Sequence, residues 1–300
     1  MAITGKEYAA TKGDVKLHVF RKYKDTPSGK PVLVLVHGSS LSAMPSYDLQ
    51  VPGHGSAYSM MDQFAERGYD VWTLDHEGYG KSSRTASSSN IAMAVDDISA
   101  ALPLLQRETG RSQYLFYGQS SGALRAALFA QKRPQQVERL VLDAFVWTGE
   151  GSPTLAKRRE GLDAYKASNM RKLTRDHVIG IFTRDKPGTS DIAVAEAVAD
   201  LQLSYGDAVP TGTYVDMCEN LPVVDPTQIT VPTLILRGEH DGIASIEDLT
   251  NFFERLPNSD KQITVLPGTA HIAHLGLNKH RFYHILFGFL ELPARRDKAA

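Results

Sequence analysis

Cysteine and net charge are both scarce in this chain of 300 residues. Its single cysteine, Cys218, cannot form an internal disulfide, and no Cys-x-x-Cys or Cys/His cluster indicates a metal site, so we interpret Cys218 as a small core residue. A formal net charge of −1 provides no basic field for nucleic acid or anionic lipid. The first residues lack the apolar core of a signal peptide, and no apolar run approaches the length of a membrane span. We therefore expect a cytoplasmic protein that binds neither nucleic acid nor membranes.

What the sequence does contain is a regular alternation of apolar strands and amphipathic helices. Runs such as "VLVLVHG" and "YDVWTLD" are continuous and apolar, which is typical of strands buried on both faces of a parallel sheet. The strands are expected over residues 7–10, 15–20, 32–38, 69–75, 112–118, 137–145, 233–241 and 261–268. Helices are expected over residues 58–68, 91–110, 121–134, 245–257 and 279–291. The pattern predicts an α/β fold with a doubly wound, mostly parallel sheet that two antiparallel strands precede.

The alternation stops between about Trp147 and Pro226. This stretch contains charged helical pieces, such as "TLAKRREGLDAYKAS" and "DIAVAEAVADLQLSYG", but no convincing buried strand. We predict a core domain formed by residues 1–146 and 227–295, and a helical lid or cap formed by residues 147–226.

Polar residues follow most of the predicted strands, and in a parallel sheet such positions meet in one crevice. Ser120 is the centre of Gly-x-Ser-x-Gly in "GQSSG", between a strand and a helix, where a sharp turn would expose its hydroxyl. Ser121 follows at the first turn of the helix, so we expect its backbone N–H, rather than its hydroxyl, to face developing negative charge. We predict that Ser120 is the nucleophile.

A serine nucleophile needs a base, and the base needs an acid. His271 follows the last strand, whereas His274 lies one helical turn further on and remains the alternative base. Asp241 follows a buried strand and precedes a glycine, while Asp143, at the end of "LVLDAF", is the alternative acid. We predict the set Ser120, Asp241 and His271.

The chain order nucleophile, acid, base resembles that of the α/β-hydrolase superfamily over nearly the whole sequence. The motifs that carry the resemblance are "HGSS" at 37–40, "DHEGYGKS" at 75–82, "GQSSG" at 118–122, "GEHD" at 238–241 and "GTAH" at 268–271. The resemblance implies an eight-stranded sheet flanked by helices. It also implies an oxyanion hole made by the backbone N–H groups of Ser39 and Ser121, with Ser40 as the alternative to Ser39. Dehalogenases and epoxide hydrolases of this superfamily carry aspartate at the elbow, so those activities are not expected here.

We therefore expect a serine hydrolase without cofactor or metal that acts on a small-molecule carboxylic ester or lactone. Phe145, Trp147 and Tyr214 are candidates for an apolar pocket beneath the lid, and the long loop from Ser40 to Tyr58 is either functional or surface decoration. An amide or aminopeptidase-like hydrolase, for which Glu150, Glu160 and Asp163 are candidate acids, stays open. So do a carbon–carbon bond hydrolase and a ligand receptor without turnover. The sequence makes no prediction about oligomeric state.

Overall fold

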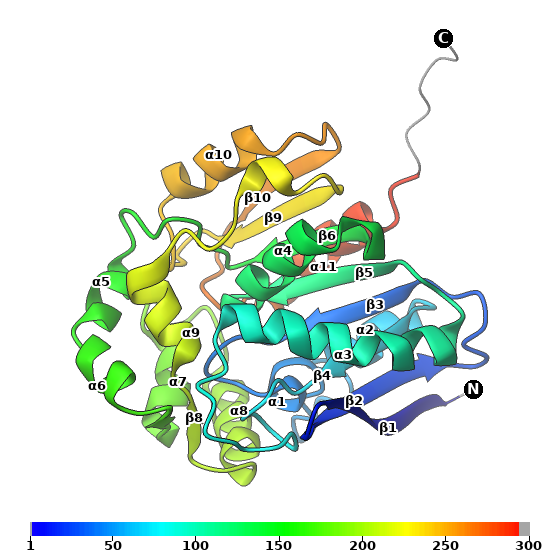
Figure 1. Ribbon diagram of the computed structural model, residues 1–300, viewed down its shortest axis with the longest axis horizontal. Coiled ribbons are helices and arrows are strands. Elements are labelled where there is room, and N and C mark those ends of the chain that lie inside the picture. Colours follow the sequence, from blue (N-terminus) through cyan, green and yellow to red (C-terminus); the bar gives the residue numbers. More distant parts are fainter. Residues whose placement is uncertain (1, 294–300) are drawn as a thin grey trace.

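A mostly parallel sheet of eight strands forms the centre of the computed structural model, which describes residues 2–293 (Figure 1). The strand order is β1-β2-β4-β3-β5-β6-β9-β10. The strands are β1 (Ile3–Lys12), β2 (Val15–Lys24), β3 (Val32–Val36), β4 (Asp70–Leu74), β5 (Tyr114–Gln119), β6 (Val137–Asp143), β9 (Thr233–Gly238) and β10 (Lys261–Leu266). β1 pairs antiparallel with β2 and β2 antiparallel with β4, and the remaining pairs are parallel. The predicted fold class is confirmed.

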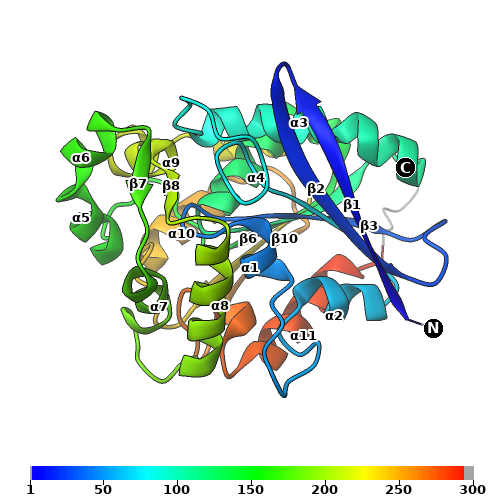
Figure 2. The ribbon, with the colours of Figure 1, turned by 90° about the horizontal axis from the view of Figure 1, so that it is seen from below.

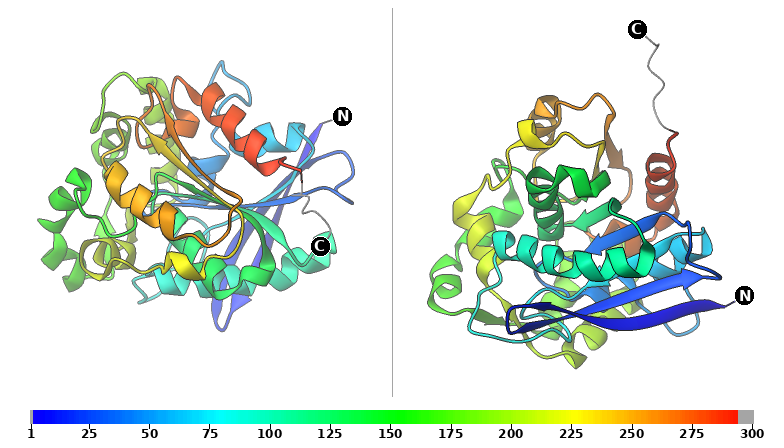
Figure 3. Two further views of the ribbon diagram at one scale, coloured as in Figure 1. Left: turned by 90° about the horizontal axis from the view of Figure 1, so that it is seen from above. Right: turned by 45° about the vertical axis from the view of Figure 1, so that its right-hand side comes forward.

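Helices cover both faces of the sheet, as the view along its edge shows (Figure 3, left). One face carries α3 (Ile91–Thr109), α4 (Ser121–Lys132) and α10 (Ile246–Arg255); the other carries α2 (Met60–Glu66) and α11 (Lys279–Leu290). Each face has its own apolar cluster, because the strand residues alternate between the two. Every residue of β3 and β4 is buried, as the continuous apolar runs of the sequence indicated.

Residues 147–226 lie between β6 and β9 in the chain and gather beyond the carboxyl ends of the parallel strands (Figures 1 and 2). Their helices are α5 (Pro153–Arg159), α6 (Leu162–Ala167), α7 (Arg175–Thr183), α8 (Ile192–Ser204) and α9 (Gly212–Val215), followed by a π-helical turn (Asp216–Asn220). Two short strands, β7 (Met170–Lys172) and β8 (Ala208–Pro210), form a separate antiparallel pair that the sequence pattern missed. Three residues are too few to show a strand periodicity.

The 147–226 segment packs on the core through an apolar cluster of its own. Val178, Phe182 and Val198 from α7 and α8 join Leu41 and Ile272 from loops of the core in this cluster. These contacts place the segment over the same strand ends that the predicted site residues follow.

The start and the end of the 147–226 segment are tied to the core and to each other. Asp248, in the first turn of α10, accepts hydrogen bonds from the backbone N–H groups of Trp147 and Thr148, both at 2.9 Å. The Trp147 indole N–H donates to the carbonyl of Val224 at 3.0 Å. The division into core and lid domains remains a prediction, and residues 294–295 of the predicted core lie outside the described residues.

The long loop expected from Ser40 to Tyr58 contains the short helix α1 (Ala43–Tyr47), whose Tyr47 hydroxyl donates to the carbonyl of Val36 at 2.7 Å. This bond fixes part of the loop against the end of β3. Over residues 2–293, no helix combines the length and the apolar character needed to cross a bilayer.

Candidate active site

Ser120 occupies a strained turn between β5 and α4. Its backbone has φ 59° and ψ −127°, a conformation that residues other than glycine rarely adopt. The two flanking glycines make the turn possible. A Cβ atom on Gly118 would lie 2.3 Å from the carbonyl oxygen of Gly122, and a Cβ on Gly122 would lie 2.1 Å from that of Val36. This conformation costs on the order of 1–3 kcal/mol, which the surrounding packing sustains, and it places the Ser120 side chain at the apex of the turn.

Three of the predicted residues form one hydrogen-bonded chain. His271 Nε2 lies 3.1 Å from Ser120 Oγ, and His271 Nδ1 lies 2.9 Å from Asp241 Oδ1. His271 comes from the loop after β10 and Asp241 from the loop after β9, so the sheet sets their positions. The Ile243 N–H also donates to Asp241 Oδ1 at 3.0 Å. Although burial alone would raise the pKa of Asp241, the charge and the hydrogen bond of His271 lower it overall.

The alternative base, His274, points elsewhere. Its Nε2 lies 2.9 Å from the carbonyl oxygen of Ser46, to which it donates. Burial lowers the pKa of His274 to about 4, which keeps the imidazole neutral near pH 7. In this arrangement His274 fixes the loop that contains α1.

The alternative acid, Asp143, is the last residue of β6, the strand that pairs directly with β9. Its Oδ2 accepts a hydrogen bond from the Tyr117 hydroxyl at 2.6 Å, while its Oδ1 has no partner among the described residues. Burial raises the pKa of Asp143 to about 8; the Tyr117 hydrogen bond opposes this shift and the charge of Asp241 adds to it. Its contacts are therefore with a phenol, not with His271.

The loop after β3 lies beside the Ser120 turn and is held by buried polar groups. The backbone N–H of His76 donates to His37 Nε2 at 3.2 Å. His37 Nδ1 therefore carries the ring proton and donates to the Gly38 carbonyl at 2.8 Å. Arg125 of α4 donates to the His37 carbonyl at 3.0 Å. Ser39 and Ser40 both line the cavity at Ser120.

Ser121 begins α4 directly after Ser120, and its buried hydroxyl has no hydrogen-bond partner within residues 2–293. The contacts of the Ser121 hydroxyl therefore give it no role in the hydrogen-bonded chain of Ser120, His271 and Asp241. The backbone N–H stands at the first position of the helix, where such groups have no partner inside the helix.

A small cavity opens at Ser120, with about 330 Å³ of empty space including its mouth to solvent. Its lining from the core is Gly38, Ser39, Ser40, Leu41, Gln119, Ser120, His271 and Ile272. From the 147–226 segment it receives Arg158, Ile181 and Arg184. None of the three predicted pocket aromatics is in this lining.

The three aromatics are used elsewhere, which corrects the predicted pocket. Phe145 is fully buried in the core and packs on Phe252 of α10, with ring centroids 4.7 Å apart. Trp147 packs on the same ring and ties the two ends of the 147–226 segment, as described above. Tyr214 approaches the cavity only through its hydroxyl, which lies 2.6 Å from Ser40 Oγ.

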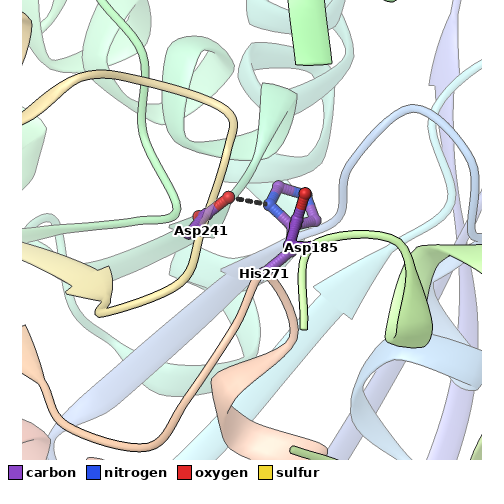
Figure 4. A group of neighbouring side chains, drawn as sticks. All are labelled: Asp185, Asp241 and His271. Carbon is purple, nitrogen blue, oxygen red and sulfur yellow. Dashed lines mark hydrogen bonds and ion pairs between the residues drawn. The ribbon is translucent and has the colours of Figure 1, made fainter. Parts of the chain in front are cut away.

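Sequence reasoning missed three charged residues near the site: Arg158, Arg184 and Asp185. Asp185 follows α7 and lies beside the His271 imidazole (Figure 4). Ligand atoms of Asp185, Asp241 and His271 all lie within 4.8 Å of one another, a spacing that could hold a cation. However, His271 Nδ1 is bonded to Asp241 and Nε2 faces Ser120, so a metal would have to displace one of these contacts.

Gln119 is a further residue that the sequence reasoning did not single out. It occupies the variable position before Ser120, and its side-chain amide donates to the carbonyl of His271 at 3.1 Å. The turn thus holds the backbone of the loop that carries the imidazole. No signal in the sequence marks this contact, because the two residues are 152 positions apart.

The sheet order, the strained Ser120 turn and the hydrogen-bonded serine, histidine and aspartate define an α/β hydrolase. The chain belongs to the serine aminopeptidase family S33, whose model matches residues 53–276. It is 33% identical over 259 residues to a 2-hydroxy-6-oxononadienedioate/2-hydroxy-6-oxononatrienedioate hydrolase of Burkholderia vietnamiensis (strain G4), a match that covers 80% of this chain and 81% of that protein.

Two solved structures illustrate how far the fold is shared. E-2-(acetamidomethylene)succinate hydrolase superposes with a TM-score of 0.69 at 18% identity, covering 96% of this chain and 100% of that one. The enol-lactonase from Burkholderia xenovorans LB400 superposes with a TM-score of 0.67 at 17% identity, covering 95% and 100%. At these identities the likeness shows the common fold.

Proposed function

We propose that this protein is a serine hydrolase that cleaves a carboxylic ester or lactone of a small molecule through an acyl-enzyme. The observation that carries the proposal is the chain from Ser120 Oγ to His271 Nε2 (3.1 Å) and from His271 Nδ1 to Asp241 Oδ1 (2.9 Å). These distances suit proton transfer from the hydroxyl to the imidazole. Ser120 and His271 both line the small cavity, so a carbonyl group that enters it meets the nucleophile and the base.

In the first half of the proposed reaction, Ser120 Oγ attacks the carbonyl carbon while His271 Nε2 takes the hydroxyl proton. Asp241 accepts the hydrogen bond from Nδ1–H, which fixes the tautomer that leaves Nε2 free to act as a base. The imidazolium that forms is stabilised by the buried carboxylate, whose pKa is lowered by this same contact. His271 then gives its proton to the leaving alcohol oxygen.

The tetrahedral intermediate carries a negative oxygen, and we assign its stabilisation to the backbone N–H groups of Ser39 and Ser121. Ser39 lines the cavity and Ser121 begins α4, whose N-terminus favours negative charge. In other hydrolases the loss of one such donor costs about 10²–10³-fold in rate. In the second half, His271 activates a water that attacks the acyl carbon and releases Ser120.

The substitution Ser120→Ala tests the proposal through the hydrolysis of 4-nitrophenyl esters. We expect turnover to fall by at least about 10³-fold, because no other hydroxyl is bonded to His271 Nε2 among the described residues. Ser121→Ala is the matched comparison: it keeps the backbone N–H and should lose far less. Wild-type turnover by Ser120→Ala would overturn the proposal. A greater loss in Ser121→Ala than in Ser120→Ala would show that Ser120 is not the nucleophile.

An aminopeptidase is less well supported than an esterase, although the family is named for one. A substrate amino terminus is cationic and needs acids in the cavity, but the charged residues that line it are Arg158 and Arg184. The candidate acid Glu160 is instead exposed and pairs with Lys157 at 2.6 Å. Glu150 lines a different surface pocket.

A carbon–carbon bond hydrolase is the second candidate, because the Burkholderia vietnamiensis relative is named for 2-hydroxy-6-oxononadienedioate. Offering this compound and the 4-nitrophenyl esters to the same preparation, with products identified by mass spectrometry, separates the two activities. A fluorophosphonate probe tests the remaining alternative, a receptor. Stoichiometric labelling of Ser120 without turnover of any ester in a broad panel would favour it.

A further inference from the structure

The part of the cavity lining that comes from the 147–226 segment is positively charged. Arg158 on α5 and Arg184 at the C-terminal end of α7 line the cavity from the 147–226 segment, and Ser120 and His271 line it from the core. The lining also includes the apolar side chains of Leu41, Ile181 and Ile272. A ligand in this cavity therefore meets reactive groups on the sheet side and guanidinium groups on the side of the 147–226 segment.

Arg158 has no acidic partner among residues 2–293. Its Nη1 donates to Met217 Sδ at 3.3 Å, a weak acceptor, and its guanidinium lies over the Tyr214 ring at 4.9 Å. Arg158 is half-buried, so its charge is partly removed from water without a carboxylate beside it. Burial lowers the pKa of Arg158, so keeping its charge here costs free energy that a bound anion would recover.

Arg184 is only loosely neutralised. Its Nε lies 3.5 Å from Asp185 Oδ2, at the outer limit for a hydrogen bond, and its side chain keeps 29% exposure. Asp185 itself lies beside Asp241 and His271. The Arg184 guanidinium thus has donors left for a ligand in the cavity that it lines.

A third arginine strengthens the positive field. The Arg171 guanidinium also lies over the Tyr214 ring, at 4.7 Å, and Arg171 has no carboxylate within ion-pair distance in the described part of the chain. Burial lowers the pKa of His177 to about 4, and the charges of Arg171, Arg158 and Arg184 act in the same direction. For Tyr214, burial alone would raise the pKa, but Arg171 and Arg158 lower it overall.

We propose that Arg158 and Arg184 form a carboxylate-binding subsite, so that the substrate is an ester or lactone whose short acyl chain bears a second, ionised carboxylate. This inference rests on the proposed hydrolase function of the same cavity. Guanidinium groups bind carboxylates through two parallel hydrogen bonds, which fixes direction as well as charge. The apolar side chains in the same lining suit a short hydrocarbon spacer. The subsite places the scissile carbonyl at Ser120 and the free carboxylate under α5 and α7.

Two methyl esters that differ only at the far end of the acyl chain test this subsite. Monomethyl succinate carries a carboxylate where methyl butyrate carries a methyl group, and a pH-stat follows both hydrolyses. We expect the wild-type protein to have the higher kcat/KM for monomethyl succinate. In Arg158→Gln and in Arg184→Gln the ratio of the two kcat/KM values should fall by about 10- to 100-fold, the usual effect of a lost charge-assisted hydrogen bond. Arg158→Lys should recover part of the ratio, since it restores charge without the bidentate geometry.

Arg175→Gln is the matched control. Arg175 also belongs to α7, but it pairs with Asp200 and Glu196 and does not line the cavity, so the ratio should stay at the wild-type value. A wild-type preference for methyl butyrate, or a ratio unmoved by both cavity substitutions, would overturn the subsite.

A binding measurement separates failure of the subsite from failure of the hydrolase proposal. Calorimetric titration of succinate into Ser120→Ala requires no turnover. Binding that is lost in Ser120→Ala/Arg158→Gln supports the subsite even if neither ester is hydrolysed, in which case only the hydrolase proposal fails. Hydrolysis of methyl butyrate together with no succinate binding overturns the subsite and leaves the hydrolase proposal standing.

Discussion

The ends of β6 and β9 carry the same kind of residue in neighbouring places, but the protein uses the two differently. Asp143 ends β6 opposite Leu236 of β9, and Asp241 follows β9 by three residues; both are buried. Asp241 meets an imidazole and a backbone N–H, and its pKa is lowered overall. Asp143 meets the Tyr117 phenol, and burial raises its pKa to about 8.

The difference teaches that strand-end position alone does not make a carboxylate an acid partner for a base. Burial disfavours the charge of both groups. Only at Asp241 do a hydrogen-bond donor and a positive partner outweigh that cost, and only there is a carboxylate available to a protonated His271. Asp143 is held mostly neutral near pH 7 and close to the charge of Asp241, which raises its pKa further.

The largest expected effect comes from Asp241→Asn. An asparagine keeps the shape of the side chain but has no negative charge to stabilise the His271 imidazolium. We therefore expect kcat/KM for 4-nitrophenyl esters to fall by about 10³–10⁴-fold. Asp143→Asn is the comparison and should lose far less, because Asp143 does not contact His271. If Asp143→Asn were the more damaging of the two, the assignment of the acid to the end of β9 would be wrong.

The next effect is on stability and concerns Asp143→Asn. Because the folded-state pKa of Asp143 is about 8 and that of an unfolded aspartate is about 3.9, the folded state binds the extra proton between these values. The stability contributed by this group is fully present below about pH 4 and is lost as pH rises toward 8, with a slope of up to about 1.4 kcal/mol per pH unit. The neutral asparagine should remove this slope.

The measurement is the free energy of unfolding by urea between pH 5 and pH 9, for the wild type and Asp143→Asn side by side. We expect the difference between them to grow in favour of the variant as pH rises. Parallel curves over the whole range would mean that Asp143 is ionised in the folded protein at neutral pH.

The smallest expected effect is that of Tyr117→Phe, which removes the hydroxyl that donates to Asp143 Oδ2. We expect a loss of about 1–2 kcal/mol in the free energy of unfolding, because Asp143 is then left buried without that partner. The loss should be larger at pH 9 than at pH 6, where the neutral carboxyl needs the bond less.

Tyr283→Phe is the control for this substitution, since the buried Tyr283 hydroxyl has no partner among the described residues. Its removal should not destabilise the protein. Equal losses in the two variants would show that the hydroxyl volume, and not the bond to Asp143, carries the effect.

The sequence by itself determined the fold class and the Ser120 turn, and it narrowed the base to His271 or His274 and the acid to Asp241 or Asp143. Continuous apolar runs identify buried strands, because parallel strands covered on both faces have no polar side. Gly118 and Gly122 mark the turn at Ser120, because no Cβ fits at either position. These are local constraints, so a linear pattern records them. The roles of Ser120, His271 and Asp241 remain proposals that the substitutions above test.

Only the tertiary structure decided what surrounds that chain. In the sequence, Arg158 belongs to a charged helical piece that is indistinguishable from a solvated face, and Arg184 and Asp185 lie in a polar connection. Packing of α5 and α7 over the strand ends brings Arg158 and Arg184 into the cavity lining and Asp185 beside His271. Only the tertiary structure also distinguishes Asp143 from Asp241. The charge of a carboxylate depends on its burial and on partners that are distant in the chain, and no local sequence pattern contains these.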